Sequence, residues 1–81
     1  MNSLQSYTLE QLKRLYLNAD LKAWKEAFEY IGFDCNDSED YAKYIIKYGI
    51  LNFISNYMCS PSDLEHFDFA VIYLMKEFNI I

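Results

Sequence analysis

The stretch of sequence that decides the fold is residues 60–81, SPSDLEHFDFAVIYLMKEFNII. Ser60 is typical of a helix N-cap, and Pro61 suits the first helical position, where a backbone N–H has no partner within the helix. The large apolar residues that follow recur at intervals of three and four, at Leu64, Phe67, Val71, Leu74, Phe78 and Ile81. This spacing predicts a helix over 61–79 whose apolar seam packs against neighbouring helices at shallow, nearly antiparallel angles.

Two further helices are expected near the N-terminus. Thr8 is a candidate N-cap, and the apolar residues behind it recur at helical spacing, which predicts a helix over 9–18. Asp20 is the next candidate N-cap, and Gly32 is typical of a helix end, so a second helix is expected over 21–31. Phe33 is then expected to fold back onto Phe28 and close that end.

The remaining helix is expected over 39–58. Ser38 is its candidate N-cap, with Glu39 and Asp40 in the first turn, where the helix dipole favours carboxylates. Its apolar residues cover more than one stripe, which indicates a largely buried helix. Gly49 is a candidate break within it.

The composition favours an all-α fold. The 81 residues include two Gly, one Pro, one Val and one Thr, too few for a compact sheet protein, while the apolar fraction of 53% excludes disorder. We therefore expect a single helical domain over 1–81, built as a small compact bundle of about four helices. Residues 1–7 are expected to form a disordered N-terminal segment.

The net charge of −5 argues against direct nucleic-acid binding, which depends on cations that neutralise phosphates. The eight tyrosines could stack on bases, but such stacking surfaces lie in positively charged grooves. The start of the chain lacks the basic and apolar regions of a signal peptide, and the longest apolar run is residues 69–75. Cys35 and Cys59 form no disulfide framework, although one bridge between them stays open. A cytoplasmic protein that does not enter the membrane is expected.

Short motifs suggest a calcium site and a zinc or nucleophilic site, but each motif lacks residues that such a site requires. Asp34, Asn36, Ser38 and Asp40 alternate as calcium ligands do in a helix-loop-helix site, but Glu39 stands where that loop needs glycine, and Ile45 where it needs glutamate. Cys59, Asp63 and His66 are too few ligands for structural zinc, and one thiol with one imidazole lacks the third group of a nucleophilic site. We expect no metal, no cofactor, no catalytic residue and no enzymatic activity.

The apolar surplus points to protein binding. Thirty-six large apolar side chains exceed what one small helical core encloses, so some are expected on the surface. The first hypothesis is a non-catalytic interaction module that binds a larger protein, or itself as a homodimer, through an aromatic helical surface. The candidate contact residues are Tyr41, Tyr44, Tyr48, Phe69 and Tyr73.

The alternative hypothesis is an acidic inhibitor of the kind that phages and mobile elements use, such as an anti-CRISPR protein or a nucleic-acid mimic. It would block a nucleic-acid-handling enzyme by presenting carboxylates where phosphates bind, and long-range attraction would speed the encounter. The residues of this acidic face are Asp34, Asp37, Glu39, Asp40, Asp63, Glu65 and Asp68.

Overall fold

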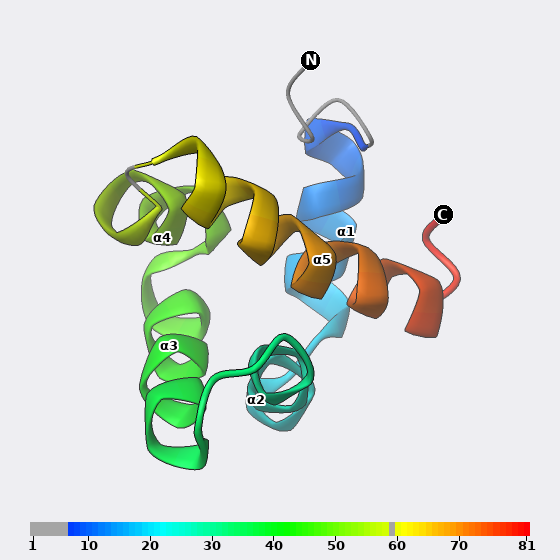
Figure 1. Ribbon diagram of the computed structural model, residues 1–81. Coiled ribbons are helices and arrows are strands. Elements are labelled where there is room, and N and C mark those ends of the chain that lie inside the picture. The colour runs from blue at the N-terminus through cyan, green and yellow to red at the C-terminus, as the bar shows by residue number, and fades with distance from the viewer. Residues whose placement is uncertain (1–6, 59) are drawn as a thin grey trace.

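The protein is an all-α bundle, as the composition predicts. The structure is a computed structural model that describes residues 7–58 and 60–81, and none of these residues lies in a strand. Five helices are present in this part of the chain, one more than expected, and Figure 1 shows their arrangement. They are α1 (Leu9–Asn18), α2 (Leu21–Tyr30), α3 (Cys35–Tyr48), α4 (Ile50–Tyr57) and α5 (Pro61–Glu77).

The predicted starts of α1, α2 and α5 are confirmed. The Thr8 hydroxyl accepts a hydrogen bond from the Gln11 N–H (3.1 Å), and the Gln11 side chain accepts one from the Thr8 N–H (2.7 Å), forming a capping box. The Asp20 carboxylate caps α2, and the Ser60 hydroxyl caps α5, with Pro61 in its first turn.

The predicted end of α2 is also confirmed to within one residue. Gly32 has a φ of +108°, and the Phe33 N–H donates to the Phe28 carbonyl at 3.1 Å. The Phe33 and Phe28 rings lie 5.9 Å apart, so an apolar contact closes the helix end as the sequence predicts.

The expected start of the third helix was four residues too late. Helix α3 begins at Cys35, and its N-cap is Asp34, whose carboxylate accepts a hydrogen bond from the Asp37 N–H at 2.8 Å. Ser38 is fully buried inside the first turns, and its hydroxyl donates to the Phe33 carbonyl at 3.4 Å. The polar residues 35–37 therefore belong to the first turn of α3, because the Asp34 side chain already caps the helix.

Gly49 divides the expected helix over 39–58 into α3 and α4. Its φ of +97° and ψ of 161° lie far from helical values, in a region that is essentially restricted to glycine. No side chain caps the start of α4.

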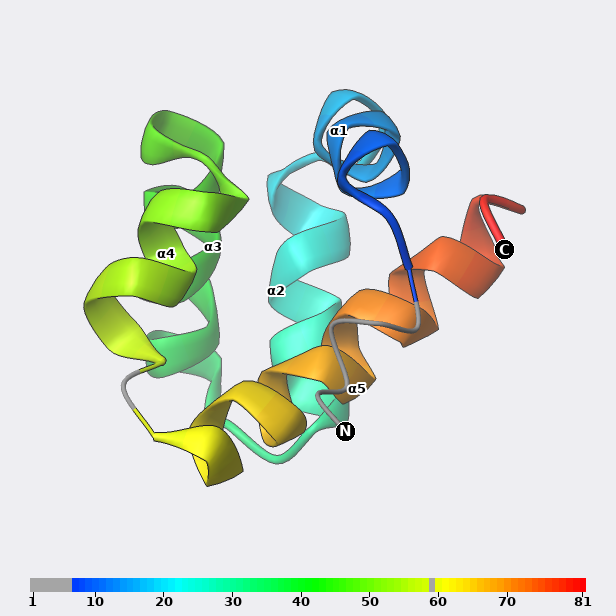
Figure 2. The same ribbon diagram turned by 90° about the horizontal axis from the view of Figure 1, so that it is seen from above.

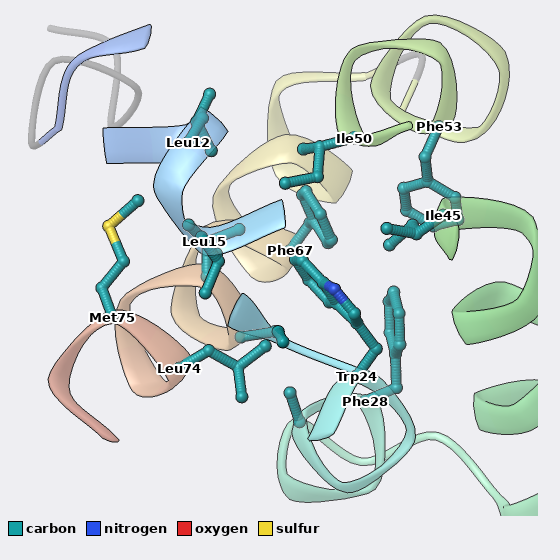
Figure 3. Packing of buried hydrophobic residues seen from close by; sticks show 14 of the residues in the cluster. Leu12, Leu15, Trp24, Phe28, Ile45, Ile50, Phe53, Phe67, Leu74 and Met75 are labelled. Carbon is teal, nitrogen blue, oxygen red and sulfur yellow. The ribbon is translucent and has the colours of Figure 1, made fainter. Parts of the chain in front are cut away.

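The core lies where α2, α3, α4 and α5 meet. Trp24, Phe28, Phe53 and Phe67 are each at most 1% exposed, with ring centroids of neighbouring pairs 5.1–6.3 Å apart. Figure 3 shows Trp24, Phe28 and Phe67 close together, with Ile50 next to Phe67 and with Phe53 of α4 next to Ile45. Burial of such rings is the main stabilising contribution in a domain of this size.

The apolar seam of α5 is buried only in its middle. Phe67, Val71 and Leu74 are buried, Leu64 is half-buried, and Phe78 and Ile81 are exposed because the helix ends at Glu77. Figures 1 and 2 show α5 crossing α1 and α2 at steep angles, so the expected antiparallel packing is wrong. The seam instead contacts several short helices in turn.

Tyr7 is anchored in the core, although it belongs to the segment expected to be disordered. Its side chain is 7% exposed, and burial together with the Asp68 carboxylate raises the pKa of its hydroxyl. The rest of that segment, residues 1–6, lies outside the described residues.

Candidate functional site

The three candidate tyrosines of α3 form one aromatic surface with Tyr57 of α4. The ring centroids of Tyr44 and Tyr48 are 4.7 Å apart, those of Tyr44 and Tyr57 5.0 Å, and those of Tyr41 and Tyr57 5.5 Å. Tyr48 and Tyr57 are exposed, whereas Tyr41 and Tyr44 are half-buried against the core. Two of these four rings therefore lie at the edge of the core, and the other two are exposed to solvent.

Tyr41 has a strong structural role. Its ring packs against Phe28 and Phe53 at centroid distances of 5.5 and 5.6 Å. Burial, and then the nearby negative charges beginning with Asp37, raise the pKa of its hydroxyl. The neutral phenol is the form that this position favours.

The two remaining candidates, Phe69 and Tyr73, lie on α5 and face α2. Tyr73 stacks on Tyr30 of α2 with ring centroids 4.4 Å apart, and Phe69 is 58% exposed. They line an open hollow of about 430 Å³ together with Tyr30, Ile72, Lys76 and Glu77. The five predicted contact residues thus divide between two places on the molecule.

A third apolar surface was missed by the sequence analysis. We call it the α1–α4 groove, an open groove of about 360 Å³ lined by Leu9, Leu12, Lys13, Tyr16, Tyr48, Gly49, Ile50, Leu51 and Asn52. Leu9 is 70% exposed and Leu51 58% exposed. Of the five predicted contact residues, only Tyr48 reaches it.

A hydrogen bond links α1 to α3 beside the α1–α4 groove. The Tyr16 hydroxyl of α1 donates a hydrogen bond of 2.7 Å to the Ile46 carbonyl near the end of α3. Gly49 then turns the chain, so that the first turn of α4 forms part of the wall. This bond joins residues thirty positions apart and lies beside the groove, since Tyr16 is one of the lining residues.

The acidic residues fall into three different situations. Asp34 and Asp37 lie at the start of α3 and Asp63 in the first turn of α5, where the helix dipoles stabilise carboxylates. Glu39 forms an ion pair with Lys43 at 2.9 Å, and this lysine lowers the pKa of its carboxyl. Asp68 is only 3% exposed and does not contribute to an acidic surface.

The starts of α3 and α5 do come near each other. His66 of α5 lies 2.6 Å from the Ile31 carbonyl through its Nε2, and its ring stacks on Phe33 with centroids 5.7 Å apart. Because Phe33 directly precedes Asp34, this contact brings Asp63 to the same side of the molecule as the acids of α3. Asp40 and Glu65 are exposed.

The described residues of the two motifs considered for metal binding lie at the starts of α3 and α5. Among residues 7–58 and 60–81, no three His, Cys, Asp or Glu side chains are grouped to hold an ion. Asp34 to Asp40 form a cap and helical turns rather than a loop. Cys35 is exposed as a free thiol, while Cys59, and with it any bridge or zinc site that includes it, lies outside the described residues.

Within the described part of the chain, no helix has the length and apolar character that crossing a bilayer requires. Comparison with protein-family models, with curated proteins and with solved structures found no match to this chain.

Proposed function

We propose that the protein is a non-catalytic interaction module, which binds another protein, or a second copy of itself, through apolar side chains on its helical surface. The observation that carries this proposal is the exposure of twelve large apolar side chains among residues 7–58 and 60–81. They include Tyr48 and Phe69 from the predicted contact set, with Leu9, Leu51 and Tyr30 beside them.

The grouping of these side chains supports the proposal more than their number does. Single exposed apolar residues are common on soluble proteins, but groups of them around a hollow are typical of binding sites. Tyrosine suits such a surface because binding removes its ring from contact with water while its hydroxyl stays hydrogen-bonded. The cytoplasm is the proposed setting, since the exposed Cys35 thiol suits a reducing compartment.

Affinity capture with surface variants tests this proposal. The wild-type full-length chain, Tyr48→Ser, Phe69→Ser and the control Lys22→Ser would be immobilised and exposed to lysate of the cells that make the protein. A specific protein retained by the wild type and by Lys22→Ser, but lost with Tyr48→Ser or Phe69→Ser, supports the proposal. Light scattering on the same variants detects self-association. Equal retention by all four, or a monomer that retains nothing, contradicts it.

The acidic inhibitor is the second candidate, and the observation that favours it is the contact of His66 with Ile31 and Phe33, which brings the first turns of α5 close to the residue before Asp34. Two of its seven carboxylates are weakened as contact groups, because Asp68 is buried and Glu39 is paired with Lys43. Binding through this face should weaken steeply as salt is added. If the affinity for the captured protein does not change with salt, the acidic face is excluded as the contact surface, and binding through the apolar side chains remains.

A further inference from the structure

We propose that the α1–α4 groove docks an amphipathic helix of another protein, and that this helix carries Asp or Glu beside its apolar face. This inference rests on the proposed function and names the surface and the partner chemistry. It concerns a surface that neither the predicted tyrosine set nor the acidic face describes, apart from Tyr48.

The apolar floor of the groove supplies the first argument. Leu12 and Ile50 are buried at its base, and the more exposed Leu9, Tyr48 and Leu51 stand at its edges. When a partner docks and covers these side chains, the gain in free energy is proportional to the apolar area that is removed from water. The Tyr16 to Ile46 hydrogen bond also links α1 to the end of α3 beside the groove.

The charge around the groove supplies the second argument. The protein carries a net charge of −5, yet Lys13 is the only charged residue among the described residues that line the groove. A second cation lies at its edge, because the Lys47 ammonium is 5.3 Å from the ring centroid of Tyr48. The groove therefore presents positive charge on an acidic protein.

The start of α4 adds to this positive character. Gly49, Ile50, Leu51 and Asn52 form the cap and first turn of α4, and all four line the groove. No side chain caps this end, so its first N–H groups lack the partner that Thr8, Asp20, Asp34 and Ser60 provide for the other four helices. A carboxylate from the partner can cap these groups and also pair with Lys13.

The form of the partner follows from the fold. The described residues contain no strand, so an extended peptide would find no sheet edge with which to pair its backbone. A helix satisfies its own backbone hydrogen bonds and presents apolar side chains at positions i, i+4 and i+7 to a groove. The proposed occupant is therefore a helix with an apolar stripe and flanking carboxylates.

Two synthetic probes test this proposal on the full-length, ¹⁵N-labelled chain. The acidic probe is a stapled helix of about 15 residues with leucines on one stripe and glutamates beside it, and the basic probe replaces every glutamate with lysine; stapling removes the marginal stability of short free helices. The acidic probe is expected to shift the backbone amide signals of Ile50, Leu51 and Asn52. Its affinity is expected to exceed that of the basic probe by about tenfold.

Matched variants locate the contact. Lys13→Glu is expected to lower the affinity for the acidic probe by about tenfold, whereas Lys22→Glu, with the same charge change on α2, should leave it unchanged. Leu51→Glu should abolish binding. Leu17→Glu is its control, since Leu17 is 74% exposed and does not line the groove. Circular dichroism checks that each variant keeps its helices.

The outcomes separate this inference from the proposed function. Three outcomes each overturn the inference: equal affinity for both probes, no binding of either probe, or signal shifts at Tyr30 and Tyr73 instead of at the α4 amides. In each case the capture experiment still decides the proposed function. Signals at Leu51 that change with protein concentration alone also overturn it, because the occupant would then be a second copy of the chain.

Discussion

The sign of the stability change in Gly49→Ala tests the junction that shapes the α1–α4 groove. Gly49 has a φ of +97° and a ψ of 161°, values that L-residues avoid. A Cβ at this position would meet no atom within 4 Å. The expected effect is therefore backbone strain alone, without a clash against a neighbour.

The magnitude follows from the backbone conformation. Holding an L-residue in this region costs about 1–3 kcal/mol. The entropy of unfolding of an 81-residue chain is about 0.17 kcal/mol/K, at about 2.1 cal/mol/K per residue, so the melting temperature should fall by about 6–18 °C. In an uninterrupted helix over 39–58, the same substitution would raise stability by about 1 kcal/mol, because alanine is the better helix former.

Thermal unfolding followed by circular dichroism measures the change, and D-alanine at position 49 in a synthetic chain is the matched control. D-alanine adopts a positive φ readily and restricts the unfolded chain, so this variant should melt at or above the temperature of the wild type. A higher melting temperature for Gly49→Ala, or an equal loss for both alanines, would refute the break between α3 and α4.

Three further predictions concern the core and the titrating groups. In urea denaturation, Phe28→Ala should lower the free energy of unfolding by about 3–5 kcal/mol, because this ring is fully buried. Phe69→Ala should lower it by less than about 0.5 kcal/mol, because this ring is exposed. Equal losses in the two variants would contradict this core. In an NMR titration, the carboxyl pKa of Glu39 should lie below its ordinary value of 4.5 and should return to that value in Lys43→Gln. Any stabilisation by this ion pair is therefore present above pH 4.5 and is lost as the pH falls. The same pKa in the variant and the wild type would refute the ion pair. The raised pKa of Tyr7 keeps its hydroxyl protonated in the folded state, so the free energy of unfolding should be highest below the ordinary pKa of 10.0 and should fall above it. Urea denaturation across this pH range should show a smaller fall in stability for Tyr7→Phe than for the wild type. An identical fall would contradict the assignment.

Local sequence signals predicted most of the helix boundaries. Thr8, Asp20 and Ser60 each cap the helix that follows them, and Gly32 ends α2, because capping depends on residues only a few positions apart. The prediction misplaced the start of α3 because it assigned the N-cap to Ser38, whereas Asp34, four residues earlier, caps the helix. Burial of Ser38 against the Phe33 carbonyl decides between them, and burial is a property of the tertiary structure.

The packing of α5 shows where periodicity stops being informative. A seam with intervals of three and four fixes which face of the helix is apolar, but not which helices cover it. Phe67 packs against Trp24 and Phe28 of α2, and α1 also packs on α5, so short helices approach the seam from different directions. The crossing angle is set by those partners.

The candidate site was predicted only in part. The tyrosines of α3 do lie together, because residues three and four positions apart share a helix face. The α1–α4 groove joins residues of α1 to the α3–α4 junction, and no local pattern relates Leu9 to Leu51. The sequence analysis assigned Asp68 to the acidic face together with Asp63 and Glu65, but its side chain is buried and lies near Tyr7.

Site-specific photo-crosslinking tests most directly whether the exposed apolar surface binds another protein. The photoreactive residue p-benzoylphenylalanine would replace Leu51, Phe69 or, as the polar control, the exposed Glu29, in cells that make the protein naturally. We predict a discrete adduct with another protein, or with a second copy of the chain, from position 51 or 69 and none from position 29. Adducts from no position, or the same adducts from all three, would contradict a specific apolar binding surface.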